Sequence, residues 1–393
     1  MASDSTSPDQ LRPSRRLLLA GYALWGEGYP NARNTVRIIG EQLGVGVVDC
    51  GFRLPGDFHL WRLARSGKRA TIVGLARLLA GNLASAMILL ARARRDDIAY
   101  VPHPSLFLLW LLSWIPTRWR PTCICDAYIT LWDTLFEDRN LGGTSAGMLS
   151  RLLLAAESRA LRAAARVVVD TAANAEHVAQ RFGVPRPRLS AIPLATDASG
   201  MTPPDPPQSP RNDQEDGIIN VLFVGTFVPL QGTTRIAAAL ERLRDDASLR
   251  FTLIGDGQAA GTVEQALQAN PRVRWLRRWT SPAEIECELR QADICLGVFG
   301  GEGKASRVLP FKLYAALAAG KPIITQQDYG LPEGTPPLPA VLVDPDPPAL
   351  AEAIQRLARS TSQREALAAR ARLYFRDHLG AATIAAHWRN WLN

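Results

Sequence analysis

The feature that most constrains this chain is a regular alternation of short apolar runs with longer helical patterns, repeated in two blocks. Short β-branched runs predict buried strands, and the segments between them have the periodicity of amphipathic helices. The predicted strands span 17–23, 45–50, 98–101, 122–126, 166–171 and 189–192 in the first block, and 220–225, 250–255, 273–276, 294–298, 322–325 and 341–343 in the second. Such alternation predicts an α/β protein with two mostly parallel sheets, each covered by helices on both faces.

The two blocks are separated by a segment of different composition. Residues 196–217 are rich in proline and polar residues and have no apolar period, so we predict a linker there. Residues 1–15 are polar and predicted to be disordered. The sequence therefore predicts domains at 16–195 and 218–378. Two doubly wound, Rossmann-like domains that face each other bind ligands in the cleft outside the carboxyl ends of their strands.

Charge is distributed unevenly between the two halves. Residues 1–195 contain 24 Lys and Arg against 15 Asp and Glu, whereas the remaining residues contain 21 against 22. No nucleic-acid motif accompanies the basic excess, so nucleic acid is not an expected partner. The five cysteines have neither disulfide nor zinc spacing, which favours a reducing cytoplasm, and Cys123 and Cys125 alternate along an apolar run, which predicts buried thiols.

Three cations gather at one predicted helix start in the second block. Lys304, Arg307 and Lys312 precede or begin a helix that Pro310 and Gly320 delimit, and no acid lies between Lys304 and its end. A helix N-terminus already carries partial positive charge. This pattern predicts an anion site.

Two glycine-containing turns of the same domain follow predicted strands. One runs from Gly225 to Gly232 and the other begins at Gly255. Backbone N–H groups at such turns can face a phosphate, although an ordinary strand-to-helix turn has the same composition. All three features lie at carboxyl ends of strands, so we expect them to converge.

The order and spacing of these segments resemble the nucleotide-sugar glycosyltransferases of GT-B fold, specifically the retaining family 4, or glycosyl transferases group 1. The resemblance is strong over 218–378 and loose in the first half. It implies that the final helix, 379–393, returns to the first domain. It also implies a donor diphosphate site and a neighbouring nucleotide or sugar site. The diphosphate site would comprise Lys304, Arg307, Lys312, Gly225, Thr226 and Phe227, and the nucleotide or sugar site Gly255, Glu302, Gly303, Ser306 and Val308.

The chain departs from the family pattern at several of these positions. Many relatives have Arg and Lys where this chain has Thr226 and Gln231, and a ribose-binding Glu where it has Ala315. A second Glu of the same family motif corresponds to Arg307 in this chain, and Glu302 could supply an acid nearby. The identity of the donor nucleotide, UDP, GDP or dTDP, is therefore open.

The first domain offers fewer candidates. Asn31 and Arg33 follow the first predicted strand and could reach a ligand in the cleft, and His103 and Asp126 each stand at a strand end. The resemblance suggests that His103 and Asp126 take part in catalysis with Arg307 and Lys312. Arg139 is a further cleft candidate, although an ion pair with its neighbour Asp138 explains it equally well.

The resemblance implies a hexosyltransferase-type enzyme that moves a sugar with retention to a glycan or lipid-linked acceptor. The leaving phosphate would accept the proton, so no protein nucleophile is needed. The sequence contains no Asp-x-Asp pair of the metal-dependent kind and no metal-ligand cluster, which predicts metal-independent transfer without a cofactor other than the donor. Alternatives are a GT-B-like sugar-nucleotide epimerase, and a non-enzymatic subunit that binds nucleotide-sugar or membrane.

A membrane surface is the remaining predicted partner. Residues 104–121 combine apolar residues with three tryptophans and two arginines, and 53–95 is strongly basic. The run 106–116 is too short to span a bilayer and is either an interfacial anchor or a core helix. We expect an enzyme of bacterial surface polysaccharide or glycolipid synthesis, cytoplasmic and peripheral at the inner face of the plasma membrane.

Overall fold

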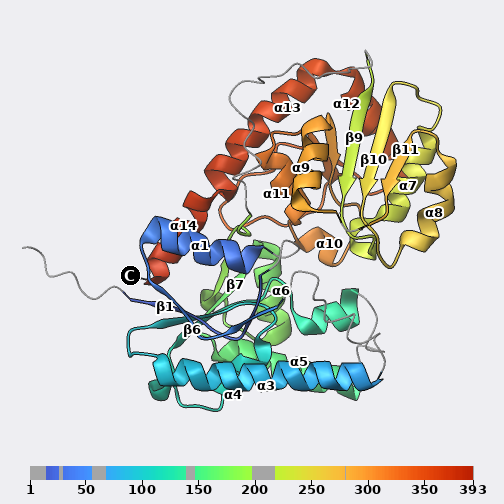
Figure 1. Ribbon diagram of the computed structural model, residues 1–393. Helices are drawn as coiled ribbons and strands as arrows, with labels where there is room; N and C mark the ends of the chain where they lie inside the picture. The colour runs from blue at the N-terminus through green and yellow to red at the C-terminus, as the bar shows by residue number, and fades with distance from the viewer. Residues whose placement is uncertain are drawn as a thin grey trace, which may run out of the picture.

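The computed structural model describes residues 15–25, 30–54, 68–138, 147–196, 217–278 and 280–392 (Figure 1). Two parallel six-stranded sheets form the cores of two domains, which confirms the predicted fold class. The predicted disordered segment and linker lie almost wholly outside the described residues, as does Arg139.

The first domain contains a sheet in the order β3-β1-β5-β6-β7-β8 and a separate parallel pair, β2-β4. The strands are β1 (Leu17–Leu19), β2 (Tyr22–Leu24), β3 (Val47–Asp49), β4 (Phe52–Leu54), β5 (Ile98–Val101), β6 (Thr122–Asp126), β7 (Arg166–Val169) and β8 (Leu189–Ala191). The strand predicted at 17–23 is divided into β1 and β2 at Gly21, whose φ of 82° is left-handed. A side chain there would overlap Ser105, so only glycine fits this bend.

Helices cover both faces of this sheet, as parallel sheets require. One face is packed by α1 (Asn31–Leu43) and the C-terminal α14 (Ala381–Leu392). The other is packed by α3 (Lys68–Arg92), α4 (Leu106–Leu112), α5 (Met148–Ala163) and α6 (Ala172–Phe182). Leu108, Leu109 and Leu112 of α4 are buried, which identifies the 106–116 run as a core helix.

The second domain has the strand order β11-β10-β9-β12-β13-β14. Its strands are β9 (Ile219–Val224), β10 (Leu249–Ile254), β11 (Val273–Leu276), β12 (Ile294–Leu296), β13 (Ile323–Gln326) and β14 (Val341–Val343). Its helices are α7 (Thr233–Arg242), α8 (Ala260–Ala269), α9 (Pro282–Gln291), α10 (Lys304–Arg307), α11 (Phe311–Ala318), α12 (Pro347–Arg359) and α13 (Thr361–Tyr374). Short helical turns comprise η1 (Thr117–Trp119), η2 (Asp133–Asp138), η3 (Arg186–Arg188), η4 (Pro229–Gln231) and η5 (Phe375–Leu379).

The chain passes from the second domain back to the first after α13 and η5 (Figure 1). Trp388 of α14 is fully buried in the first domain, where its indole meets the Tyr100 ring edge-on at a centroid distance of 5.2 Å. The domains also contact each other through residues that follow the carboxyl ends of both sheets. Ala172 N–H donates to Leu331 O, and Glu333 N–H donates to Ala191 O. The fold therefore places strand-end residues of both domains at one interface.

Candidate active site between the two domains

Two backbone turns of the second domain, after β9 and after β10, pack tightly against each other at the carboxyl edge of its sheet. Gly255 has a φ of 128°, and a Cβ there would lie 2.0 Å from Gly225 O. Gly225 N–H donates to Ile254 O, and Phe227 N–H donates to Asp256 O. These two predicted diphosphate donors are therefore used within the fold.

The side chains of this turn differ in position. The Phe227 ring is fully buried and stacks on Trp275 at 5.0 Å, so it supports the turn from below. Thr226 is exposed at the turn itself. Gln231 is buried, and its Oε1 has no hydrogen-bond partner. Only Thr226 presents its side chain to solvent among these three.

Lys312 is the cation of this edge that lacks a carboxylate among the described residues. Its ammonium group lies 3.7 Å from the centre of the Phe223 ring and donates to Gly297 O at 3.2 Å. A Cβ on Gly225 would lie 2.9 Å from Lys312 Nζ, so the cation stands beside the turn after β9. Burial lowers the pKa of Lys312 well below its usual value, because the charged form loses water. An anion at this turn would restore the charged form.

Lys304 and Arg307 occupy the four-residue helix α10, separate from α11. The sequence predicted a single helix start for all three cations. In the structure Pro310 is the N-cap of α11, so Lys312 belongs to α11 and the other two cations belong to α10. Arg307 Nη2 lies 3.4 Å from Glu137 Oε2 of the first domain, and Arg307 Nε is buried without a partner. Lys304 lowers the pKa of His103 and of Asp133, so its charge also acts on the first domain.

The loop before α10 is held by two residues that the sequence analysis missed. Gln326 is fully buried and exchanges two hydrogen bonds of 2.8 Å with the Gly301 backbone. Arg235, in the first turn of α7, donates to Phe299 O at 2.6 Å. A lone Arg or Gln at a helix or strand end carries no distinctive signal. Their partners are backbone groups more than twenty residues away.

The four predicted nucleotide or sugar residues around α10 have different environments. Glu302 and Gly303 are exposed, and Ser306 Oγ donates to Gly303 O at 2.9 Å. Val308 is buried, so its side chain belongs to the core. Glu302 therefore presents its carboxylate to solvent, whereas Val308 anchors the chain between α10 and α11 in the core.

A buried polar network connects the predicted first-domain residues. Asp126 Oδ2 accepts hydrogen bonds from Tyr100 and Tyr128, at 2.5 and 3.2 Å. Burial raises the pKa of Asp126 to about 7. Asn31 donates to Tyr128 Oη at 2.7 Å and accepts from Ala195 N–H at 2.7 Å. Both predicted residues thus bind within the protein, at the point where the chain leaves the first domain.

His103 lies beside this network at the domain interface. It lines a small cavity whose other walls include Asn31 and Tyr128 of the first domain and Phe311 of the second. Its Nδ1 is buried without a partner. Desolvation, helped by the Lys304 charge, lowers the pKa of His103 to about 4, so the ring is neutral at pH 7. Arg33 is half-buried in the first turn of α1.

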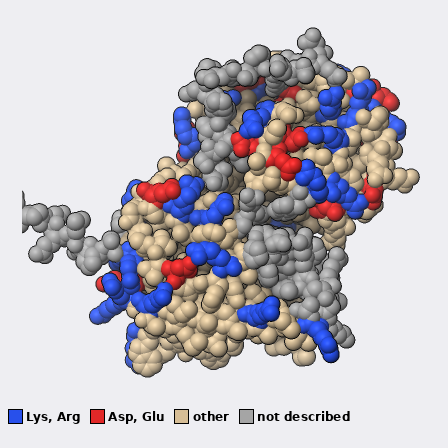
Figure 2. Space-filling model, in the orientation of Figure 1, with Lys and Arg blue, Asp and Glu red and all other residues tan. Residues whose placement is uncertain are grey.

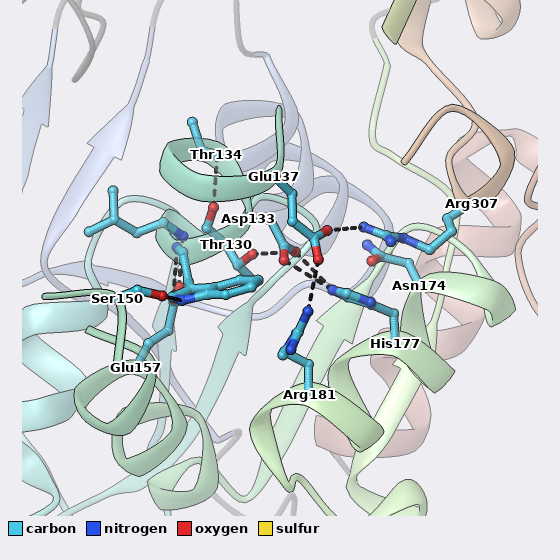
Figure 3. Close-up of polar contacts among 12 residues, drawn as sticks. Thr130, Asp133, Thr134, Glu137, Ser150, Glu157, Asn174, His177, Arg181 and Arg307 are labelled. Carbon is cyan, nitrogen blue, oxygen red and sulfur yellow. Dashed lines mark hydrogen bonds and ion pairs between the residues drawn. The ribbon is translucent and has the colours of Figure 1, made fainter. Parts of the chain in front are cut away.

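A second polar cluster, which the sequence did not predict, joins the domains (Figure 3). Asp133 and Glu137 of η2 and His177 of α6 offer ligand atoms within 4.8 Å of one another. His177 Nε2 lies 3.0 Å from Asp133 Oδ1, and Glu137 pairs with Arg181 at 3.0 Å as well as with Arg307. Asp133 and Glu137 are one helical turn apart, but His177 is distant in sequence, which hid the cluster.

The charges around this cluster argue against a divalent cation. Arg181 and Arg307 already neutralise Glu137, and Lys304 and His177 lower the pKa of Asp133. A metal ion would stand among these positive groups and repel them. We interpret the cluster as an ion network across the interface.

A separate cavity of the second domain lies at the other edge of its sheet. Its volume is about 440 Å³, and it opens at the amino ends of β9, β10 and β11, where Arg250, Arg272 and Arg274 line it. The convergent glycine turns and the cations Lys304, Arg307 and Lys312 lie at the opposite, carboxyl ends. We place the candidate active site at the carboxyl ends, because a sheet of this type binds ligands there.

Comparison with known proteins assigns both halves of the chain. Residues 219–360 match the family described as glycosyl transferases group 1, and residues 25–195 match the glycosyl transferase 4-like domain. A D-inositol 3-phosphate glycosyltransferase of Pseudarthrobacter chlorophenolicus is 29% identical over 104 residues. That match spans a quarter of each chain.

Solved structures of the same architecture match over nearly the whole chain. HepE of Anabaena, crystallised with UDP and glucose, is 14% identical, with a TM-score of 0.63 over 96% of this chain and 99% of its own. The N-terminal domain of trehalose-6-phosphate phosphatase of Candida albicans is 12% identical, with a TM-score of 0.67 over 98% of both chains. At such identities the likeness establishes the fold. With both halves matched in the expected order, the chain belongs to the group 1, family 4-like glycosyltransferases of GT-B fold.

Proposed function

We propose that the protein transfers a sugar, with retention, from a nucleoside-diphosphate sugar to a glycan or lipid-linked acceptor. The observation that carries this proposal is the Lys312 ammonium, which lies beside the glycine turn after β9 without a carboxylate partner among the described residues. A half-buried cation of this kind is stabilised by a bound anion. UDP-bound relatives of the same fold support a nucleotide-sugar as the source of that anion.

The transfer itself exchanges two bonds to the sugar. The bond between the anomeric carbon and the β-phosphate oxygen breaks, and a bond from the acceptor oxygen to the same carbon forms. The acceptor proton moves to the leaving phosphate, which yields a nucleoside diphosphate and a glycoside. We propose that Lys312, Arg307 and Lys304 stabilise the charge that develops on the diphosphate. These three cations supply the compensating positive charge, and we propose neither a metal nor a further cofactor.

First-domain residues are proposed to orient the acceptor and the donor sugar. His103 is neutral and half-buried at the interface, with a free Nδ1, so it can exchange a hydrogen bond with a sugar hydroxyl. Asp126 is proposed to act indirectly: it accepts a hydrogen bond from Tyr128, whose hydroxyl in turn accepts one from Asn31. We also propose work at the cytoplasmic face of a bacterial membrane, in polysaccharide or glycolipid synthesis.

Thermal melts with UDP, GDP, dTDP and their sugars test the donor site, because a ligand that binds the folded state raises Tm. The expected result is one nucleotide that stabilises the wild type and loses this effect in Lys312→Met, which keeps the apolar stem over Phe223. Arg95→Gln, an exposed arginine of the first domain, is the charge-matched control. Stabilisation that persists in Lys312→Met would contradict the proposed site.

Product analysis separates the enzyme from its alternatives. A glycosyltransferase consumes donor only when acceptor is present and keeps the anomeric configuration, which NMR of the product reads directly. An epimerase would convert the donor without acceptor, and a non-enzymatic subunit would bind nucleotide without turnover. Unchanged activity in the presence of a chelator is the expected result for a metal-independent reaction.

A further inference from the structure

Helix α3 exposes an apolar face along its whole length. Ile72 is 65% exposed, Leu83 50% and Met87 59%, whereas Leu89 on the opposite side is fully buried. Val73, Leu75 and Leu79 belong to the same exposed set. These residues recur at helical spacing and form one stripe that no described residue covers. Exposed apolar area of this extent indicates a binding surface.

The neighbouring helices extend this surface. Helix α4 packs against both α3 and α5, and the three form a layer on the sheet. Fifteen large apolar side chains are exposed among the described residues, and eleven of them belong to this layer and the turn after α4. Besides the α3 residues they are Trp114, Trp119, Met148, Leu149 and Leu152. The second domain contributes only Leu342 and Leu373, so the apolar surface is specific to one side of the molecule.

The exposed charges of this layer have one sign. Arg69 and Arg77 of α3, Arg118 after α4 and Arg151 of α5 are exposed. The one acid of these three helices, Glu157, is buried and accepts the N–H groups of Leu131 and Trp132 (Figure 3). Figure 2 shows the lower part of the molecule as largely uncharged surface with isolated basic groups.

The inner side of α3 is fixed to the protein. Ser85 Oγ donates to Cys50 O and accepts from Gly21 N–H, both at 2.7 Å, and Tyr22 Oη donates to Arg77 O at 3.0 Å. By length and composition, Thr71–Arg92 is the one helix among the described residues that could cross a membrane. Crossing would break these contacts. These contacts hold α3 against the first domain along its inner side.

We propose that the outer side of the α3–α4–α5 layer binds the interface of an anionic lipid bilayer, with α3 parallel to the membrane plane. Apolar side chains would enter the acyl boundary, the exposed tryptophans would lie at headgroup level, and the arginines would contact anionic headgroups. Trp114 and Trp119 each carry a guanidinium over the ring, Arg159 at 3.6 Å and Arg118 at 4.6 Å. The inference deepens the proposed function and rests on it only for a lipid-linked acceptor, which this surface would meet at the membrane.

Vesicle co-sedimentation of the full chain tests this surface. We expect binding to vesicles of equal parts phosphatidylcholine and phosphatidylglycerol, and at least about tenfold weaker binding to phosphatidylcholine alone, since the exposed arginines of this layer are attracted to an anionic surface. Leu79→Glu with Leu83→Glu should reduce binding to the mixed vesicles by at least about tenfold. The matched control is Leu342→Glu with Leu373→Glu, which places the same changes on exposed leucines of the second domain.

Equal binding by the two double variants would overturn the proposal, as would absence of binding by the wild type. A wild-type dimer that Leu79→Glu with Leu83→Glu converts to a monomer would also overturn it, because a second copy would then cover the face. Nucleotide-dependent Tm is measured on the same proteins. If nucleotide raises the Tm of the wild type but the wild type does not bind vesicles, only the proposed membrane surface is contradicted. If no nucleotide raises the Tm of the wild type, the proposed function is contradicted.

Discussion

Replacing Glu137 by glutamine is expected to tighten the binding of a nucleoside diphosphate. Arg307 pairs with Glu137 at 3.4 Å and has no second ion pair within the described part of the chain. If Arg307 binds the donor diphosphate, as proposed, its guanidinium must leave Glu137. Glu137 stays neutralised, because Arg181 remains at 3.0 Å. On binding the diphosphate, the wild type therefore loses the Arg307–Glu137 ion pair, whereas Glu137→Gln has no such pair to lose.

The size of the effect follows from the geometry. Two unit charges 3.4 Å apart attract each other by about 5 kcal/mol at an effective dielectric constant of about 20. Water offsets most of this, because the Arg307 and Glu137 side chains are 18% and 29% exposed, and such pairs contribute about 1 kcal/mol or less. That free energy corresponds to a Kd about two- to fivefold lower in Glu137→Gln.

Isothermal titration at fixed ionic strength measures this difference, with the nucleotide that stabilises the wild type most. Glu176→Gln is the control: Glu176 is exposed on α6, and its replacement changes the net charge equally without touching Arg307. If Glu137→Gln and Glu176→Gln have the same affinity, or Glu137→Gln binds more weakly, Arg307 stays with Glu137 in the complex and the reasoning is refuted.

Three further predictions concern stability. Burial raises the pKa of Asp126 to about 7, so the folded state binds a proton that the unfolded state releases above about pH 4. The Tm of the wild type should therefore rise as pH falls from 8 to 6. Asp126→Asn should remove this part of the rise. Differential scanning calorimetry of both proteins checks it, and parallel curves would contradict the raised pKa. Gly255→Ala should lower the free energy of unfolding by more than about 2 kcal/mol in urea titrations, because its Cβ would overlap Gly225 O; near-normal stability would show that the turn can relax. Trp388→Ala should cost about 3–5 kcal/mol by the same measurement, and a loss below about 1 kcal/mol would mean that α14 is not held against Tyr100 as described.

Periodicity was enough to predict the two parallel sheets, because short apolar strands buried on both faces differ clearly from amphipathic helices. Cysteines 123 and 125 were expected as buried thiols, and both are buried in β6. The convergence of Lys312 with the Gly225 turn was also predictable, since carboxyl ends of neighbouring parallel strands share an edge. These conclusions depend on local pattern and on sheet topology alone.

Other features depended on tertiary placement. The Glu137–Arg307 pair joins residues 170 positions apart in different domains, and only the relative orientation of the domains brings them together. Asp126 was expected near a substrate, but Tyr100 and Tyr128 enclose its carboxylate. The apolar composition of α3 is as typical of a core helix as of an exposed one. Periodicity gives the spacing of apolar residues and does not identify what lies opposite them.

The return of α14 to the first domain determines how the two halves of the molecule can move. The chain reaches the interface at Leu194 and Ala195, and it returns to the first domain near Gly380. Leu194 N–H is bound to Tyr314 of one domain, and Ala195 N–H to Asn31 of the other. A rotation about an axis close to these two places would leave both hydrogen bonds intact, whereas sliding one domain past the other would break them. We therefore expect the two domains to open and close by a hinge rotation near Leu194 and Gly380.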